Sequence, residues 1–202
     1  EILGARQHGH VAAIGLDLYT RLLAEAVKRV RADADEPPGV PESVGRELAR
    51  IDPGGLPTID LPLDAYLPEE FVPGTQERTR LYRRMAAADD EAAVREIELE
   101  LRDRFGRPPA PVRHLLIVLR LRVLAHLAGA TSVGREGSVV AMRWPESRTV
   151  DRARLIEALE KGAIVGQHRV AIPFEGPPER WLPRVQRLVQ SAVDVAQAPV
   201  DA

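Results

Sequence analysis

The 202-residue sequence contains no cysteine. This absence excludes disulfide bonds, thiolate nucleophiles, and zinc or iron–sulfur sites held by cysteine. The sequence also lacks any apolar run near the ~20 residues that a membrane-spanning helix requires, and it does not open on a signal peptide. These absences predict a cytoplasmic protein with no membrane partner.

Phosphate-binding and metal-binding motifs are also missing. The glycines of the 129–134 stretch are not followed by the Lys-Ser or Lys-Thr pair that contacts a nucleotide phosphate, so we interpret the stretch as a turn between a helix and a strand. His8 and His10 are two residues apart beside glycine, and His114 and His126 fall about 120° apart on an α-helix. Neither pair has the spacing of metal ligands. We therefore expect no catalytic residue, no metal site and no cofactor in this chain.

Charge is present in nearly equal amounts of both signs. The sequence has 28 Lys and Arg residues against 30 Asp and Glu residues, which gives a formal net charge of -2. No global field would hold such a chain on DNA or on an anionic membrane. Hydrophobic residues make up 45% of the chain, enough for a folded core. Residue 1 is Glu and not Met, so we expect a piece of a longer polypeptide.

Apolar periodicity predicts an α+β fold in which several helices pack with a small, mostly antiparallel sheet, preceded by a helical appendage. The predicted helices cover residues 16–31, 41–50, 76–85, 89–105, 111–127, 150–161 and 179–195. The predicted strand over 58–63 contains Pro62, which withholds a ladder donor and favours an edge position. Hairpins are predicted over 131–143, with 134–137 as the turn, and over 164–174.

An acidic, proline-containing stretch at 33–39 marks the best candidate linker. We accordingly divide the chain into an appendage at 1–35, a linker at 36–57, a main domain at 58–196 and a tail at 197–202.

The predicted helix over 89–105 has one buried stripe and two charged flanks. The stripe consists of Val94, Ile97, Leu101 and Phe105. Glu96, Glu100 and Asp103 gather on one flank, and Arg95 and Arg102 on the other. The acidic flank is either a solvated surface or a docking surface, and we expect it to be exposed and not grouped with cations of the same chain.

Two further groups of residues leave alternatives open. Arginines at 80, 83, 84, 113, 120 and 122 form a phosphate-binding patch if their helices lie side by side, or else an ion-paired surface among neighbouring acids. Trp144 and Trp181 are either binding anchors or part of the core, and core packing is favoured.

Two motifs resemble the C-terminal domain of the bacterial transcription-repair coupling factor, the Mfd family. They are residues 81–85 (Leu-Tyr-Arg-Arg-Met) and 100–109 (Glu-Leu-Arg-Asp-Arg-Phe-Gly-Arg-Pro-Pro). Residues 3–10 (Leu-Gly-Ala-Arg-Gln-His-Gly-His) and 15–19 resemble the end of that family's motor, where a motif shared with RecG links ATP hydrolysis to translocation. Gln7 matches the glutamine of this translocation motif, whose upstream part is missing here. His8 stands where the family usually has serine, so no role is carried onto it.

The resemblance implies a regulatory role for the chain. The family consists of ATP- and Mg-dependent translocases that track along duplex DNA, push on stalled RNA polymerase and recruit UvrA. Its C-terminal domain is implied to fold back on an N-terminal module resembling UvrB, and so to mask the UvrA-binding surface until polymerase is engaged. The acidic element that contains Glu100 and Asp103 matches the position that pairs with basic residues of that module. The alternative function is an auxiliary nucleic-acid-binding module that uses Arg80, Arg83, Arg84 and Arg120.

Overall fold

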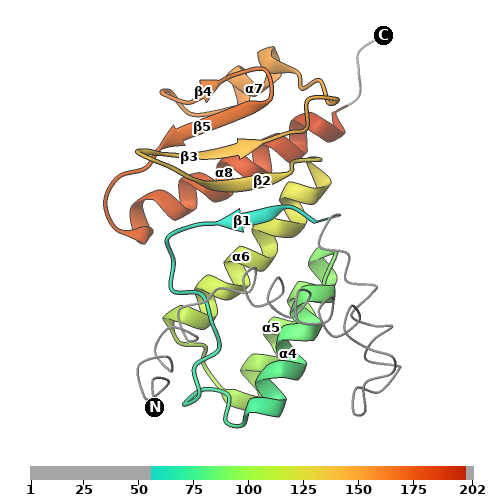
Figure 1. The fold of residues 1–202 in the computed structure, drawn as a ribbon, viewed down its shortest axis with the longest axis vertical. Helices are drawn as coiled ribbons and strands as arrows, with labels where there is room; N and C mark the ends of the chain where they lie inside the picture. The colour runs from blue at the N-terminus through green and yellow to red at the C-terminus, as the bar shows by residue number, and fades with distance from the viewer. Residues whose placement is uncertain (1–55, 199–202) are drawn as a thin grey trace, which may run out of the picture. The chain divides into compact units, whose positions relative to one another are not determined.

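In the computed structural model of the chain, residues 56–198 are described, and they form an α+β fold, as the sequence predicts (Figure 1). Along the chain the elements are β1 (Thr58–Asp60), α4 (Thr75–Ala87), α5 (Glu91–Phe105), α6 (Ala110–Leu127), β2 (Ser132–Glu136), β3 (Val139–Arg143), α7 (Arg152–Ala158), β4 (Ile164–Val165), β5 (Arg169–Pro173) and α8 (Pro178–Gln197). None of these helices is long and apolar enough to cross a membrane.

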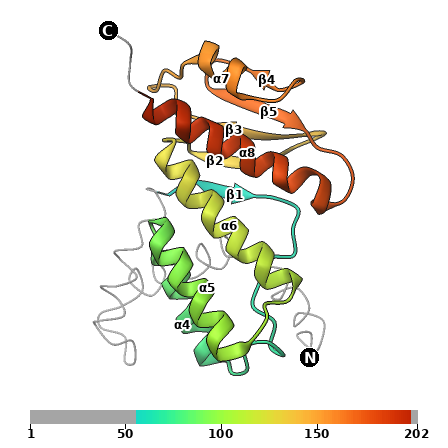
Figure 2. The same cartoon turned by 180° about the vertical axis from the view of Figure 1, so that it is seen from behind.

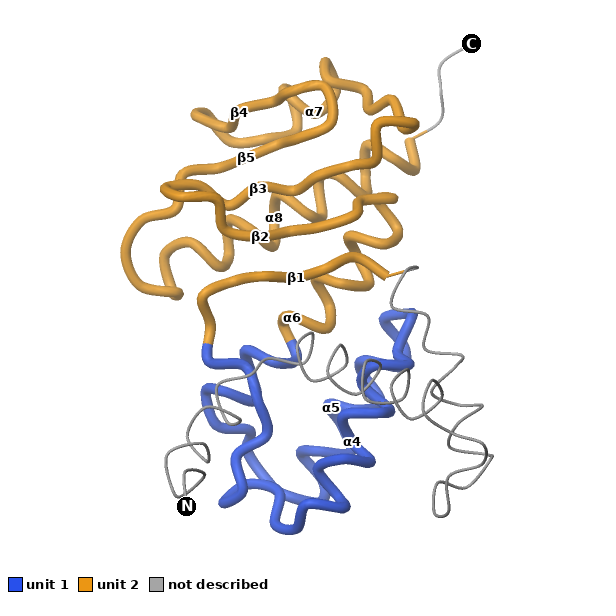
Figure 3. The backbone as a smooth tube through the Cα atoms, viewed as in Figure 1, with its two compact units in different colours: residues 1–55, 64–116 blue, residues 56–63, 117–202 orange. Residues whose placement is uncertain are grey.

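The described chain divides into two compact units (Figure 3). Unit 1 contains residues 64–116 and therefore holds α4 and α5. Unit 2 contains residues 56–63 and 117–198, with every strand and helices α7 and α8. Helix α6 contributes residues to both units.

Local hydrogen bonds explain where helix α5 of unit 1 begins and where it ends. The Asp90 carboxylate accepts a hydrogen bond from the Ala93 backbone N–H at 2.7 Å, which caps the first turn. At the other end, Gly106 adopts a φ of 85°, a conformation that costs glycine least, and its N–H donates to the Arg102 carbonyl.

The core of unit 1 is the apolar stripe of α5 packed among residues of α4 and the start of α6. Its most deeply buried side chains are Val72, Leu81, Met85, Val94, Ile97, Leu101, Val112 and Leu115. Phe105 completes the predicted stripe from a half-buried position, where its ring centroid lies 5.8 Å from that of Phe71. The opposite side of α5 is left to solvent.

Unit 2 is built on a five-stranded sheet in the order β1-β2-β3-β5-β4. Only β1 is parallel to its neighbour, because three helices separate it from β2 along the chain. The other pairings are antiparallel. Strand β1 lies at the edge that Pro62 predicts, although it ends earlier than expected, at Asp60.

One face of this sheet is apolar. It carries Val133, Val140, Met142, Val170 and Ile172, all fully buried. Helix α8 runs along this face, as the two opposite views show (Figures 1 and 2). The apolar side of α8 presents Trp181, Leu182, Val185, Leu188, Val189, Ala192 and Val193. The core of unit 2 therefore lies between the sheet and α8.

Both tryptophans belong to this core, which confirms the favoured interpretation. Trp181 is 1% exposed, and its ring centroid lies 4.9 Å from that of Phe174. Trp144 is 5% exposed, and its indole N–H donates to the Ala128 carbonyl at 2.9 Å. Satisfying the indole N–H is what permits a buried tryptophan.

Two sequence predictions about unit 2 were wrong in detail. The turn of the first hairpin is at Gly137 and not over 134–137, because Gly134 is paired with Ala141 inside the sheet. Glycine leaves room for the neighbouring strand there, since a Cβ at Gly134 would lie 3.3 Å from the Asp60 carbonyl oxygen of β1, which is a tight contact. The helix predicted over 150–161 is shorter. It begins after Asp151, whose side chain accepts a hydrogen bond from the Arg154 N–H, and it ends before Leu159, whose backbone is extended.

Several predictions lie outside the described residues. They are the helices over 16–31 and 41–50, the appendage at 1–35, the linker at 36–57 except its last two residues, and the motif residue Gln7. These assignments, and the domain boundaries drawn from them, stay predictions.

Candidate functional site

The acidic flank of α5 was the candidate site, and the structure separates its three residues by environment. The side chain of Glu96 is 73% exposed, whereas that of Glu100 is only 19% exposed. Asp103 is exposed and forms no ion pair with any of residues 56–198. The flank therefore contains one enclosed carboxylate and two outward-facing ones.

Glu100 is enclosed by three arginines. Its Oε1 lies 3.0 Å from Arg80 Nη2 and 2.7 Å from Arg104 Nη1, and its Oε2 pairs with Arg84. Arg80 and Arg84 come from α4, one turn apart, while Arg104 follows Glu100 by one turn on α5. Glu100 thus joins the two helices electrostatically.

Glu77 is a second centre in the same network. Its Oε1 lies 2.9 Å from Arg80 Nη2 and 2.6 Å from Arg104 Nη1, so both arginines are shared with Glu100. We call these five residues the α4–α5 cluster: Glu77, Arg80, Arg84, Glu100 and Arg104. Shared guanidinium groups with two or more donors each suit this arrangement, because one fork can serve two carboxylates.

The cluster lowers the pKa of both carboxyl groups. Hydrogen bonds from Arg80 and then Arg104 hold the pKa of Glu77 below its ordinary value. For Glu100, partial burial works to raise the pKa, but the hydrogen bond from Arg104 and the charges of Arg84 and Arg80 outweigh it, and the net pKa is lowered. Both groups are therefore ionised throughout the neutral range.

These pKa shifts predict an acid-sensitive unit 1. A carboxyl group whose pKa is lower in the folded state contributes stability above its unfolded pKa of about 4.5, and this contribution is lost as pH falls through the folded value. We expect urea denaturation to show the free energy of unfolding falling as pH drops below about 4.5. The double variant Glu77→Gln, Glu100→Gln should be less stable at pH 7 and flatter in this acid range. Parallel pH profiles for the variant and the parent protein would contradict the assignment.

The expectation that the acidic flank is not grouped with cations of the same chain was wrong at Glu100. Part of the reason was visible in the sequence, since Arg104 follows Glu100 at i+4 and falls about 40° from it on the helix. The other part is tertiary, because the sequence alone did not place α4 beside this flank. At Glu96 the pairing is weak, with Arg84 Nη2 at 3.5 Å.

The arginine patch that would bind phosphate does not form as a set of free cations. Arg80 and Arg84 are held by carboxylates, and Arg122 is only 9% exposed. Arg113 donates to the Pro108 carbonyl at 3.0 Å. Within residues 56–198, Arg83 is exposed without an ion pair. These observations count against the nucleic-acid interpretation.

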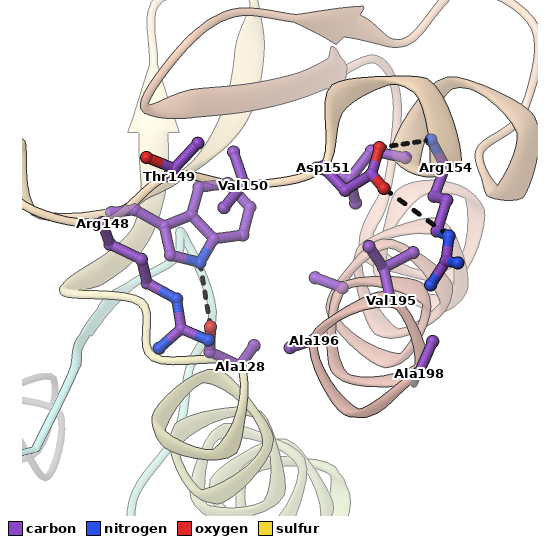
Figure 4. A pocket seen from close by; sticks show the side chains of 12 residues that line it. Ala128, Arg148, Thr149, Val150, Asp151, Arg154, Val195, Ala196 and Ala198 are labelled. Atoms are coloured by element: carbon purple, nitrogen blue, oxygen red, sulfur yellow. Dashed lines mark hydrogen bonds and ion pairs between the residues drawn. The ribbon is translucent and has the colours of Figure 1, made fainter. Parts of the chain in front are cut away.

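Unit 2 contains a pocket of about 340 Å³ between the end of α6, the 148–151 segment, α7 and the last turns of α8 (Figure 4). Trp144, Leu155 and Ala192 contribute buried apolar walls. Arg148 and Arg154 lie on opposite sides of it (Figure 4).

The charged groups of this pocket have structural roles. Asp151 caps α7, accepting from the Arg154 N–H at 3.0 Å and lying 3.5 Å from its Nε. The Arg148 guanidinium lies against Gly129, whose φ is +66° and where a Cβ would overlap it. A cation at this place complements the negative end of α6. Residues 56–198 contain no cluster of three or more His, Asp or Glu residues that could hold a metal ion.

Comparison with known proteins identifies related sequences. A TRCF domain family matches residues 61–155. The transcription-repair-coupling factor of Mycobacterium tuberculosis (strain CDC 1551 / Oshkosh) is 33% identical over 207 residues, which cover 98% of this chain and 16% of that protein. The protein of the same name from Escherichia coli (strain K12) is 34% identical over 162 residues, 80% of this chain and 13% of that protein. The chain thus spans about a sixth or less of the length of these relatives.

A solved structure shares the fold. The crystal structure of the C-terminal domain of transcription-repair coupling factor superposes with a TM-score of 0.62 at 17% sequence identity, over 71% of this chain and 96% of that one.

Proposed function

The chain belongs to the transcription-repair coupling factor family as a counterpart of its C-terminal domain, and we propose that it is a non-catalytic regulatory domain. In this proposal it docks on the N-terminal UvrB-like module of the same protein. Docking masks the surface that binds UvrA until RNA polymerase is engaged. ATP, Mg and duplex DNA are handled by the motor of the full-length, cytoplasmic protein and not by this chain.

The observation that carries the proposal is the unpaired acid on the outer face of α5. Asp103 is exposed and has no cation partner within the described residues, while the neighbouring Glu100 already has three. The family resemblance assigns this acidic element to contact with basic residues of the UvrB-like module. An acid without an internal partner is available for such a contact, and charge complementarity across an interface sets specificity and orientation.

Within the proposal, the three flank residues have different tasks. Asp103 and the exposed Glu96 meet the basic residues of the module directly. Glu100 acts through the α4–α5 cluster, since its carboxylate fixes α5 against α4 and so holds the outer face in place. The proposal therefore assigns the first contact to Asp103 and the support to Glu100.

Binding in trans tests the proposal against its alternative. We expect the chain to bind the isolated UvrB-like module, as measured by calorimetry, and the Asp103→Lys variant to bind at least about tenfold more weakly. A short DNA duplex titrated under the same conditions should give no heat. Tight duplex binding that weakens steeply with salt, together with no binding of the module, would favour the nucleic-acid alternative.

A further inference from the structure

Helix α5 exposes one large apolar side chain on its outer face. Leu99 is 54% exposed, whereas the other large aliphatic residues of this helix, Val94, Ile97 and Leu101, are 0 to 1% exposed. Burying a leucine side chain stabilises by ~1.5 to 3 kcal/mol, so the core of unit 1 gains little from Leu99 where it stands.

The helical neighbours of Leu99 are all charged. Residues three and four positions away on a helix lie beside a given side chain. For Leu99 these are Arg95 and Arg102 on one edge, and Glu96 and Asp103 on the other. An exposed leucine therefore stands between a basic edge and an acidic edge.

These four charged residues form few close ion pairs within residues 56–198. Arg95 and Asp103 form no ion pair with residues 56–198. The pairs of the other two are long, at 3.5 Å for Glu96 with Arg84 and 3.8 Å for Arg102 with Glu98. Their exposed side chains remain able to contact another surface.

An apolar residue ringed by polar ones is the arrangement of a protein–protein hot spot, in which the ring excludes water from the central contact. The two-edged charge pattern also defines an orientation, since a partner with the opposite order of charges would meet like charge on both edges. Isolated exposed apolar residues are common, and the described part of the chain offers one for comparison. Ile156 on α7 is 60% exposed, and its neighbours include Ala153 and Leu159.

We propose that Leu99 is the apolar anchor of the α5 docking surface, which consists of Arg95, Glu96, Leu99, Arg102 and Asp103. The partner surface that fits it has an apolar socket, with basic side chains beside Glu96 and Asp103 and acidic side chains beside Arg95 and Arg102. This inference rests on the proposed function for the identity of the partner, the UvrB-like module. It adds that apolar burial holds the complex, while the charges choose its orientation.

The Leu99→Gln variant tests the anchor. Glutamine keeps the length and the helix propensity of leucine, so the fold should be retained, as thermal melting would verify. We expect its affinity for the isolated UvrB-like module to fall by tenfold or more. The matched control is Ile156→Gln, which removes an equally exposed aliphatic side chain elsewhere and should leave the affinity unchanged.

The salt dependence of binding distinguishes the apolar contribution of Leu99 from the electrostatic contribution of Asp103. At about 1 M salt the Debye length is ~3 Å, so the loss caused by Asp103→Lys should shrink, whereas the loss caused by Leu99→Gln should persist. If Leu99→Gln binds the module with wild-type affinity while Asp103→Lys binds it more weakly, Leu99 is not the anchor, but the proposed function still holds. Equal losses for Leu99→Gln and Ile156→Gln would also overturn the anchor. Absence of any binding by the parent chain would remove the proposed function and the anchor together.

Discussion

The Asp103→Lys substitution in the full-length protein that carries this chain is expected to raise its affinity for UvrA by tens of fold in the absence of polymerase. The expected cause is loss of the proposed closed form, in which we propose that the α5 docking surface covers the UvrB-like module. Asp103 is the appropriate position because it has no cation partner among residues 56–198, so its replacement leaves no internal group unpaired.

Population arithmetic gives the size of this effect. Truncating one partner of a desolvated interfacial charge pair costs about 2 to 5 kcal/mol, against ~0.2 to 1 kcal/mol for an exposed pair. If the closed form is favoured about 99 to 1, a loss of roughly 3 kcal/mol brings open and closed forms near parity. The fraction able to bind UvrA then rises from about 1% to about half, and the apparent affinity rises in proportion.

A matched charge reversal provides the control for this measurement. Glu157 on α7 is also an exposed acid without an ion pair in the described residues. The Glu157→Lys variant makes the same change in net charge, so general electrostatic effects on UvrA binding would appear in both variants. Titration curves for Asp103→Lys that coincide with those of the parent protein would return the acidic flank to the solvated-surface interpretation.

The helices of this fold could be predicted from the sequence because their signals are local. The stripe of α5 repeats at helical spacing, Asp90 caps its start and Gly106 ends it, so each boundary depends on residues a few positions apart. The hairpin turn was misplaced because glycine also signals a turn when it is needed for another purpose. Gly134 makes room for β1, a strand more than 70 positions earlier in the chain, and no local pattern shows that contact.

The sequence predicted that the three acids share one flank of α5, but it did not predict their different surroundings. Helical geometry correctly gathered Glu96, Glu100 and Asp103 on one flank of α5. Which of them remains available depends on α4, which supplies Arg80 and Arg84 to Glu100. Leu99 was not predicted because it belongs neither to the buried stripe of α5 nor to its charged flanks. The charged residues at i±3 and i±4 around a leucine were the signal that could have identified it.

Replacing Glu100 with Lys is expected to destabilise unit 1 by about 2 to 3 kcal/mol, so docking is better tested by reversing the charge of Asp103 alone than by reversing both acids. The substitution removes the carboxylate that three guanidinium groups share and adds a fourth cation among them. Breaking a fully buried ion pair costs about 3 to 5 kcal/mol. We place the cost below that range because the Glu100 side chain is 19% exposed and its arginine partners are 40 to 57% exposed.

Urea denaturation at pH 7 measures this cost, and Asp103→Lys is the control with the same change in charge on the same helix. Its free energy of unfolding should lie within about 0.5 kcal/mol of the parent value, because an exposed residue without an internal partner loses no contact. Glu100→Gln should fall between the two variants, since it keeps the shape of the side chain and adds no cation. If all three variants unfold at the same urea concentration as the parent, water stabilises the three arginines as well as the Glu100 carboxylate does. The α4–α5 cluster then contributes nothing to holding α5 in place, and Glu100 must act, if at all, by direct contact with the module.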